Sequence, residues 1–454
     1  MELSSALAEV LGDASRVSTG DSLLEQHAGD LTYHPPHRPD VVVSPTSTDE
    51  VARVLALADR ERVPVVASGA RTSLEGHVIP VQGGIALDLT GLDRILAVDA
   101  LDLSATVEAG VTRLRLNERL GRDGLVFPVD PGADATLGGM AATNASGTTT
   151  VRYGGMRAHV LALQVVLASG RVVRTGSRAR KSSAGYDLTS LFIGSEGTLG
   201  VITELTLRVH GIREHVVAVR AAFAELDAAC AGAVALVGAG VSVERLELLD
   251  APTLRAVNAY KGTSYDEAPS LFFELAGTEA GVDGDLAASR ELLEGCHAFQ
   301  VEHDPTARHR LWEARHHVLF ALVAASPGRE HMSTDVCVPI FRLPEALRHA
   351  RRAIDERDLD AAIVAHAGDG NYHVLFMLDP TDPSELERAR SLNDEIVEWA
   401  LAHGGTCTGE HGIGLGKIAY LEREHGDLVP LMRGVKRLLD PHGILNPGKV
   451  LPNP

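Results

Sequence analysis

Residues 136–147 read TLGGMAATNASG, a segment built almost entirely from small residues. An earlier segment, residues 68–76, reads SGARTSLEG and follows a short apolar strand. Small residues allow backbone N–H groups to approach a ligand closely, and Ser and Thr hydroxyls add hydrogen-bond donors. Residues 68–76 can therefore cradle phosphate oxygens, although this loop taken alone is equally consistent with an ordinary connection.

Two other nucleotide-binding patterns are excluded. The sequence has no GxGxxG after a strand, so a Rossmann-type NAD site is not indicated. Residues 411–418 read HGIGLGKI and resemble a P-loop. However, His411 occupies the first glycine position and Ile418 the Ser/Thr position, so the motif is incomplete.

The composition is that of a soluble globular protein with more than one domain. The chain has 454 residues, of which 45% are hydrophobic and 23% charged. Its net charge of -19 disfavours binding to nucleic acid, because an acidic surface repels phosphate backbones. The four cysteines form no CxxC pair, which argues against a disulfide framework, a zinc ribbon and a Cys-ligated iron–sulfur cluster.

The first residues, MELS, contain neither a basic nor an apolar region of the kind found in secretory signals. The most apolar long stretch, residues 228–243, is too short to span a bilayer. We therefore expect a cytoplasmic or organelle-matrix protein without a transmembrane segment, and peripheral attachment to a membrane is left open.

The pattern of secondary structure expected from the sequence changes near residue 212. Short strands and helices alternate from residue 39 to 209, whereas long Ala/Leu/Glu-rich helices follow, such as residues 384–403. This change predicts an N-terminal lead-in (1–37), a glycine-loop domain (38–212) and a second, α+β domain (213–454).

Residues 362–376 read AIVAHAGDGNYHVLF, a pattern typical of a β-hairpin. An Asp-Gly pair between apolar runs favours a two-residue type I′ turn at Asp369–Gly370. That turn would place His366 directly opposite His373, with Cβ atoms about 4.5–5.5 Å apart. Two imidazoles so placed can share a divalent ion, with bonds of about 2.0–2.1 Å.

A third ligand is offered by residues 404–414, which read GGTCTGEHGIG. Glu410 would complete a two-His-one-carboxylate site with open positions for substrate. His411 would then be available as a general base. Two alternatives remain at this point: Glu410 and His411 can be a solvated loop pair, and Cys407 can ligate a metal, although a small buried residue is the simpler interpretation of that cysteine.

Several strings in a fixed order resemble the FAD-binding domain of the vanillyl-alcohol oxidase / p-cresol methylhydroxylase flavoprotein superfamily. They are residues 129–147, RYG at 152–154, GYDL at 185–188, GSEGTLGVIT at 194–203 and DPHGILNPGK at 440–449. The resemblance implies an α+β protein with a two-subdomain FAD-binding domain (38–212). It also implies a C-terminal α+β substrate, or cap, domain (213–454) with an antiparallel sheet, whose last residues return to the FAD.

The resemblance also implies which residues contact FAD. They are Ser68, Gly69, Ala70, Arg71, Thr72, Ser73, Gly76, Pro131, Gly132, Thr136, Gly139, Thr143, Asn144, Gly147, Glu196, Gly200, Ile202 and Asn446. Members with covalent flavin carry a His near the position of Arg71, so we expect non-covalent FAD here. His77 is a weaker candidate for attachment.

The histidine hairpin and the Glu410-His411 pair resemble the D-2-hydroxyacid dehydrogenase branch of this superfamily. That branch includes cytochrome-type D-lactate dehydrogenases, the glycolate oxidase flavin subunit and D-2-hydroxyglutarate dehydrogenases. The resemblance implies that His366, His373 and Glu410 bind a divalent metal, Zn or Mn, and that His411 is the catalytic base.

The resemblance also concerns the substrate. Residues 312–317 read WEARHH, where the branch has Trp-x-x-Arg, which implies that Arg315 holds the substrate carboxylate. Without the resemblance, an arginine on a helix surface is the stronger interpretation. Residues 331–339, HMSTDVCVP, resemble the cytochrome-type D-lactate dehydrogenases, and they lack the Lys-x-Asp of the hydroxyglutarate branch at residues 333–335.

Together these features predict FAD-dependent oxidation of a D-2-hydroxy acid, D-lactate or a related monocarboxylate, to the 2-oxo acid. The sequence shows no second redox centre, so electrons should pass to a separate acceptor: cytochrome c, a quinone or an electron-transfer flavoprotein. The alternatives are a glycolate oxidase flavin subunit, a D-2-hydroxyglutarate dehydrogenase, and a non-redox flavoprotein scaffold or ether-lipid synthase-like enzyme. A homodimer is left open.

Overall fold

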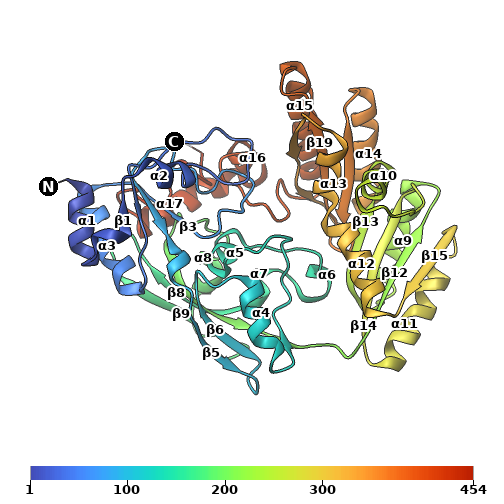
Figure 1. The fold of residues 1–454 in the computed structure, drawn as a ribbon, viewed down its shortest axis with the longest axis horizontal. Coiled ribbons are helices and arrows are strands. Elements are labelled where there is room, and N and C mark those ends of the chain that lie inside the picture. Colours follow the sequence, from blue (N-terminus) through green and yellow to red (C-terminus); the bar gives the residue numbers. More distant parts are fainter. Residues whose placement is uncertain (1, 453–454) are drawn as a thin grey trace. The chain divides into compact units, whose positions relative to one another are not determined.

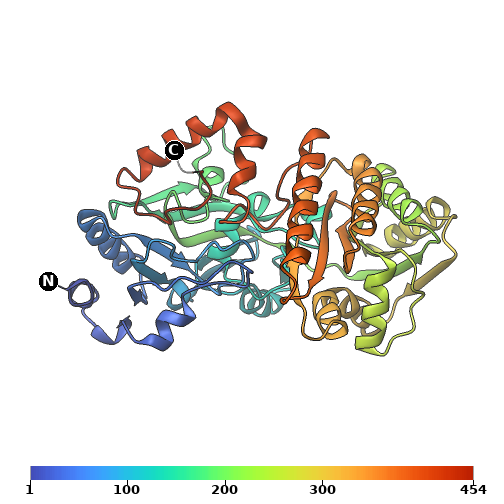
Figure 2. The same cartoon turned by 90° about the horizontal axis from the view of Figure 1, so that it is seen from above.

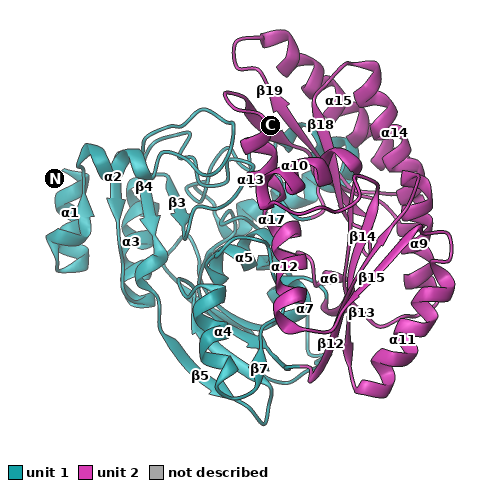
Figure 3. Cartoon of the chain, turned by 45° about the vertical axis from the view of Figure 1, so that its right-hand side comes forward, with its two compact units in different colours: residues 1–146, 154–212, 410–454 teal, residues 147–153, 213–409 magenta. Residues whose placement is uncertain are grey.

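The computed structural model describes residues 2–452, which fold into two compact units (Figure 3). Unit 1 comprises residues 1–146, 154–212 and 410–454, and unit 2 comprises residues 147–153 and 213–409. This division differs from the expected one at two places. Residues 147–153 belong to unit 2, and residues 410–454 belong to unit 1 rather than to the C-terminal domain.

Unit 1 begins with a small sheet of the order β1-β2-β4-β3, in which β2 and β3 run parallel to β4. Its strands are β1 (Val17–Ser18), β2 (Val41–Val43), β3 (Val65–Ser68) and β4 (Ile85–Asp88). The expected lead-in is part of this layer, because α1 (Leu3–Leu11) buries Leu7 and Leu11 in the same core as α3 (Thr48–Glu61).

The second sheet of unit 1 is antiparallel, with the order β5-β6-β10-β8-β9. Its strands are β5 (Ile95–Asp99), β6 (Ser104–Glu108), β8 (Val160–Val166), β9 (Val172–Gly176) and β10 (Val201–Arg208). The small-residue helix α5 (Leu137–Thr143) packs Leu137, Met140 and Ala141 into the core of this sheet, which fixes the glycine segment against it (Figure 1).

The remaining elements of unit 1 are α2 (Asp21–Gln26), α4 (Arg113–Gly121), β7 (Leu125–Val126), α7 (Met156–His159), α8 (Leu188–Phe192), β11 (His210–Gly211), α16 (Ile418–His425) and α17 (Val429–Leu439). The last two helices precede a segment in which Leu445 pairs with Val65 of β3. The C-terminal segment is therefore built into the first sheet.

Unit 2 contains an antiparallel sheet, whose described residues form eight strands. The order is β15-β12-β14-β13-β18-β19-β16, and β17 also pairs with β19. The strands are β12 (His215–Ala222), β13 (Val243–Leu249), β14 (Ser270–Gly277), β15 (Ala298–Glu302), β16 (Glu330–Ser333), β17 (Val336–Cys337), β18 (Ala361–His366) and β19 (Asn371–Leu378). The expected antiparallel sheet in the C-terminal domain is thus confirmed.

Helices cover both faces of this sheet (Figures 1 and 2). The face that carries Leu249, Phe272 and Val364 is covered by α10 (Ala251–Lys261), α12 (Pro305–His316) and α13 (Val318–Ala325). The opposite face, which carries Leu271, is covered by α9 (Leu226–Gly238). The other helices of unit 2 are α6 (Thr150–Tyr153), α11 (Glu279–Leu292), α14 (Leu343–Glu356) and α15 (Pro383–Ala402).

Within residues 2–452, no helix is both long enough and apolar enough to cross a bilayer.

The hairpin of β18 and β19 differs from the predicted one in its turn. His366 pairs with Asn371, and His373 pairs with Val364, so the predicted opposition of His366 and His373 is wrong by two residues. The loop consists of four residues, 367–370, rather than two. Because side chains alternate along a strand, a shift of two residues leaves both histidines on the same face of the sheet.

The turn explains the shift. A type I′ turn needs a positive φ at both central residues, but in this loop Gly370 has φ +80° while Asp369 has no positive φ. The N–H of Asp369 instead donates to the carbonyl of His366 at 3.0 Å, as in a type I turn. A Cβ on Gly370 would lie 2.0 Å from the carbonyl oxygen of Val338, so the close approach of that strand also requires glycine.

We expect Gly370→Ala to destabilise the protein by about 3 kcal/mol or more, because left-handed strain adds to an overlap with rigid backbone. Gly262→Ala is the matched control. Gly262 also lies in unit 2 and has φ +66°, but nothing lies within 4 Å of the position that a methyl group would take there. It should cost about 1–2 kcal/mol. Urea unfolding followed by circular dichroism measures both, and equal losses would contradict the close-approach argument.

Candidate functional site

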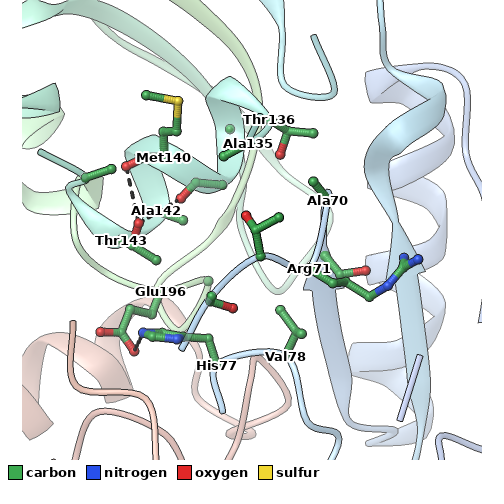
Figure 4. A pocket seen from close by; sticks show the side chains of 18 of the residues that line it. Ala70, Arg71, His77, Val78, Ala135, Thr136, Met140, Ala142, Thr143 and Glu196 are labelled. Atoms are coloured by element: carbon green, nitrogen blue, oxygen red, sulfur yellow. Dashed lines mark hydrogen bonds and ion pairs between the residues drawn. The ribbon is translucent and has the colours of Figure 1, made fainter. Parts of the chain in front are cut away.

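A cavity in unit 1 opens between the loop after β3 and the small-residue helix α5 (Figure 4). The cavity and its open mouth hold about 1230 Å³ of space free of protein atoms. Fourteen of the predicted FAD contacts line it: Ser68, Gly69, Ala70, Arg71, Thr72, Ser73, Pro131, Thr136, Gly139, Thr143, Glu196, Gly200, Ile202 and Asn446. The predicted contacts Gly76, Gly132, Asn144 and Gly147 are not among its lining residues.

The two glycine segments meet at Gly69. A Cβ on Gly69 would lie 2.0 Å from the side-chain oxygen of Thr136, so only glycine permits this approach. Next to it, the hydroxyl of Ser68 is buried and has no hydrogen-bond partner among the described residues. A buried hydroxyl donor beside a glycine that permits close approach suits an anionic phosphate ligand, so these residues of the cavity fit a dinucleotide such as FAD.

Arg71, which lines the cavity, has a left-handed backbone. Its φ is +55°, a left-handed conformation that costs a non-glycine residue about 1–2 kcal/mol. The guanidinium Nη1 lies 3.1 Å from Nε2 of His27, and this His27 nitrogen lies 3.4 Å from Oδ2 of Asp88. The Arg71 side chain is therefore anchored on α2 and β4 while its residue lines the cavity.

Glu196 ties the cavity wall to the C-terminal segment. Its two carboxylate oxygens accept the N–H groups of Ile413 at 2.7 Å and Gly414 at 2.8 Å. Its Oε2 also lies 3.4 Å from Nε2 of His77. The side-chain amide of Asn446 donates to the backbone carbonyls of His77 and Glu196, at 3.0 and 2.7 Å.

The buried pair His77 and Glu196 shifts the pKa of both groups. Burial alone would lower the pKa of His77 and raise that of Glu196. The attraction between the two charges outweighs burial, so the pKa of His77 lies above its usual value and that of Glu196 below it. The state in which His77 is protonated and Glu196 is ionised is therefore favoured in this part of the cavity wall.

Glu410 and His411 also line the cavity of unit 1. The hydroxyl of Ser146 donates to Oε2 of Glu410 at 3.3 Å. The imidazole of His411 lies 3.7 Å from Glu410 through Nε2 and 4.0 Å from Glu75 through Nδ1. The flavin-side cavity and the predicted base thus occur in one unit.

In unit 2, His366 and His373 lie on one face of the sheet with ring centroids 5.6 Å apart and ring planes at 89°. Nδ1 of His366 lies 2.7 Å from Oε1 of Glu247, and Nδ1 of His373 lies 2.9 Å from the carbonyl oxygen of Thr334. A carboxylate and a carbonyl only accept hydrogen bonds, so both Nδ1 atoms carry the proton. Each Nε2 is then the ring atom with a lone pair for a cation.

Arg315 of α12 forms an ion pair with Glu247. Its Nε and Nη2 donate to the same oxygen of Glu247, at 2.7 and 2.6 Å. Burial raises the pKa of Glu247, but Arg315 and His366 outweigh it, so the pKa lies below its usual value. Sequence reasoning missed Glu247. Its one signal is a charged residue within the apolar run Leu246–Leu249.

Asp335 is a second residue that sequence reasoning left without a role. Its carboxylate accepts hydrogen bonds from the Thr408 hydroxyl at 2.7 Å, the Gly409 N–H at 3.0 Å and the Asn371 amide at 2.7 Å. Asp335 is fully buried. It therefore fixes the loop that leads into Glu410, which follows Gly409 in the chain.

Comparison with known proteins identifies the family. A model of the FAD-binding domain matches residues 39–176, and a model of the C-terminal domain of FAD-linked oxidases matches residues 212–450. Over 453 residues, 98% of this chain and 91% of the relative, the chain is 44% identical to a Danio rerio protein named probable mitochondrial D-lactate dehydrogenase. The chain belongs to the FAD-linked D-2-hydroxyacid dehydrogenase family.

Other family members agree. The chain is 45% identical to an Arabidopsis thaliana protein named mitochondrial D-lactate dehydrogenase (cytochrome), over 91% of this chain and 74% of the relative. It is 34% identical to the glycolate oxidase subunit GlcD of Bacillus subtilis, over 96% and 95%. The chain is therefore a FAD-linked oxidoreductase, as predicted.

Solved structures confirm the fold class. p-Cresol methylhydroxylase with bound substrate superposes with a TM-score of 0.81 at 19% identity, covering 98% of this chain and 95% of the other. A 4-ethylphenol oxidase from Gulosibacter chungangensis gives 0.80 at 18% identity, covering 99% and 97%. At this identity the likeness establishes the shared fold alone.

The expected cytoplasmic location is wrong. The relatives from Danio rerio, Arabidopsis thaliana, Saccharomyces cerevisiae and Kluyveromyces lactis are all named mitochondrial, which contradicts the cytoplasmic expectation. The expectation rested on the first residues of the chain. Targeting segments lie outside the folded part of a protein, so they leave no trace in the motifs that identify the family.

Glu196→Gln tests the cavity wall. The pKa of Glu196 is lowered in the folded protein, so this group stabilises the fold above pH 4.5, its ordinary pKa, and that stabilisation is lost as the pH falls. The pKa of His77 is raised in the folded protein, so this group stabilises the fold below pH 6.5, its ordinary pKa, and that stabilisation is lost as the pH rises. The pair therefore contributes most between those two pH values. We expect the variant to lose about 1–3 kcal/mol there.

Thermal unfolding across pH 4–9 measures this loss, which should shrink above that window as His77 loses its proton. Glu118→Gln is the control, because its side chain is 77% exposed. A loss that is the same at every pH would contradict the ion-pair argument.

Proposed function

We propose that this enzyme oxidises a D-2-hydroxy acid, D-lactate or a related monocarboxylate, to the 2-oxo acid and passes the electrons to a separate acceptor. The observation that carries the proposal is the 44–45% identity, across most of the chain, to proteins named D-lactate dehydrogenase. The chemistry of the residues in each unit supports the same conclusion.

FAD would occupy the cavity of unit 1 without a covalent bond and would accept a hydride equivalent from the substrate. Its phosphates would meet the cradle at Ser68 and Gly69, where the buried hydroxyl and the close backbone approach favour an anion. Arg71 stands where a covalently attached member has histidine, and an arginine cannot form that bond. His77, the other candidate for attachment, is held in the ion pair with Glu196.

A divalent cation, Zn or Mn, would be held by His366, His373 and Glu410. Two imidazoles and one carboxylate suit these metals. The acceptors on both Nδ1 atoms give each ring the tautomer that a metal ligand needs, and Asp335 fixes the residue before Glu410. The cation would supply a positive centre for the substrate hydroxyl.

Arg315 would bind the substrate carboxylate. Two of its five N–H groups are committed to Glu247, which leaves three donors of the guanidinium for a ligand. Residues 333–335, Ser-Thr-Asp, carry no lysine to neutralise a second carboxylate, which favours a monocarboxylate. His411 would take the hydroxyl proton as general base.

The acceptor is cytochrome c, a quinone or an electron-transfer flavoprotein. The four cysteines offer no second redox centre, since none is disulfide-bonded and no pair forms a CxxC.

The same motifs leave two alternative substrates to D-lactate. Glycolate is favoured by the 34% identity to a glycolate oxidase subunit, and D-2-hydroxyglutarate is disfavoured by the absent lysine.

Anaerobic D-lactate should bleach the yellow absorbance of the FAD-loaded enzyme near 450 nm within seconds to minutes, whereas L-lactate should not. The same assay with glycolate and D-2-hydroxyglutarate ranks the alternatives by rate. His411→Ala should retain FAD and lose the reduction by a factor of about 10²–10⁴, the usual contribution of a general base. If no 2-hydroxy acid bleaches the flavin, the chain is a flavoprotein scaffold rather than a dehydrogenase.

His373→Ala should lose bound divalent metal while it retains FAD, because the histidine lies in unit 2 and the FAD cavity in unit 1. Elemental analysis gives the metal, and absorbance gives the flavin. His303→Ala is the control: this histidine of unit 2 is exposed, and its removal should change neither quantity. Unchanged metal content in His373→Ala would remove the hairpin from the metal site.

A further inference from the structure

Glu247 lies near the middle of the large sheet of unit 2, on β13 beside β18, and the proposed function uses it only as a hydrogen-bond acceptor for His366 and Arg315. It pairs with His366 across the two strands. Its side chain is buried, with only 1% of its area exposed. Removing an ionised carboxylate from water is costly unless charged or hydrogen-bonding partners compensate it.

The partners of Glu247 are divided between its two oxygens. Oε1 accepts from Nδ1 of His366 at 2.7 Å, and Oε2 accepts from Nε and Nη2 of Arg315 at 2.7 and 2.6 Å. The carboxylate therefore joins a histidine of the β18–β19 hairpin to an arginine of α12. The two oxygens of a carboxylate keep a fixed separation, so His366 and Arg315 cannot shift independently while both contacts hold.

We propose that Glu247 is the positioning residue that sets the spacing between Arg315 and His366 and thereby selects acids whose hydroxyl lies on the carbon next to the carboxylate. This inference rests on the proposed function, in which Arg315 binds the substrate carboxylate and His366 belongs to the metal site. A 3-hydroxy acid places its hydroxyl one carbon farther from the carboxylate. A fixed spacing between Arg315 and His366 that suits a 2-hydroxy acid cannot suit a 3-hydroxy acid equally.

Glu247 also sets the tautomer of His366. A carboxylate can only accept, so it keeps the proton on Nδ1 and leaves Nε2 as the ligand atom. A glutamine at this position would have one acceptor and one donor. If its oxygen stays on Arg315, its NH₂ group faces Nδ1 of His366, and the ring must move its proton to Nε2 or turn away.

A purely structural role predicts something different. Buried ion pairs are weak sources of stability, and a merely structural glutamate would affect folding without affecting one ligand site. Glu244 offers the comparison on the same strand. Its Oε1 accepts from the hydroxyl of Tyr153 at 2.6 Å, and it lies at the register shift between Val243 and Arg245, outside the ladder that pairs Glu247 with His366.

The experiment compares Glu247→Gln with Glu244→Gln in the FAD-loaded full-length protein. Titration with Mn²⁺ and with Zn²⁺, in the absence of substrate, should show a 10–100-fold weaker affinity for Glu247→Gln, the usual effect of losing the acceptor behind a metal-binding histidine. Glu244→Gln should bind both ions as the wild type does. Flavin absorbance should show full FAD in both variants.

The second readout is selectivity. The ratio of kcat/KM for D-lactate to that for D-3-hydroxybutyrate should fall at least tenfold in Glu247→Gln, chiefly through a higher KM for D-lactate, and should not change in Glu244→Gln. Glu247→Asp keeps the charge but withdraws both oxygens by one methylene. It should retain the His366 tautomer better than Glu247→Gln and still lose selectivity, and it replaces Glu247→Gln if that variant does not fold.

Metal affinity and selectivity within twofold of wild type in the folded Glu247 variant would overturn the positioning role. If His373→Ala then still loses metal and wild type still oxidises D-lactate, the proposed function stands and this inference alone fails. If none of the 2-hydroxy acids reduces the flavin of the wild-type protein, the proposed function fails instead.

Discussion

The cavity of unit 1 depends on the carboxylate of Glu196. It holds two backbone N–H groups of the 413–414 turn and pairs with His77, while the backbone carbonyl of Glu196 accepts from Asn446. Four stretches of chain that are far apart in sequence meet at this one residue. The hydrogen bonds to the N–H groups of Ile413 and Gly414 and from Asn446 satisfy groups that burial would otherwise leave without a partner, so displacing any of these segments leaves a buried group unpaired.

Glu247 and Asp335 organise unit 2 in the same manner. Each is fully buried, and each divides its acceptors between a histidine or amide of the β18–β19 hairpin and a neighbouring element. The acidity of the chain, with a net charge of -19, is thus partly internal and already matched by donors.

The sequence predicted the fold class and the segments of the cofactor cavity because glycine and other small residues report directly on close backbone approach. Gly69 is an example, since Thr136 leaves no room for a side chain there. The register of the histidine hairpin was predicted wrongly. An Asp-Gly pair favours a two-residue turn locally, but the close approach of Val338 to Gly370 selected a four-residue loop, and a distant strand is invisible to local turn rules.

Glu247 and Asp335 were beyond the reach of pattern reasoning for a related cause. A carboxylate that accepts from residues 68 and 119 positions away, as Glu247 does, has no spacing that a motif can capture. The return of the last residues to the FAD-binding part was predicted, but the boundary at residue 410 was not. Residues 410–454 differ little in composition from the segment before them, yet they complete unit 1 by pairing Leu445 with Val65 and Asn446 with Glu196.

The chain passes between its units after residues 146, 153, 212 and 409. During synthesis the ribosome therefore finishes unit 2 before it makes the last part of unit 1. Unit 2 can complete its sheet while unit 1 still lacks α16, α17 and the segment that carries Asn446. A cofactor pocket lined by Asn446 can be completed only after that residue has been made, so flavin loading follows the synthesis of unit 2.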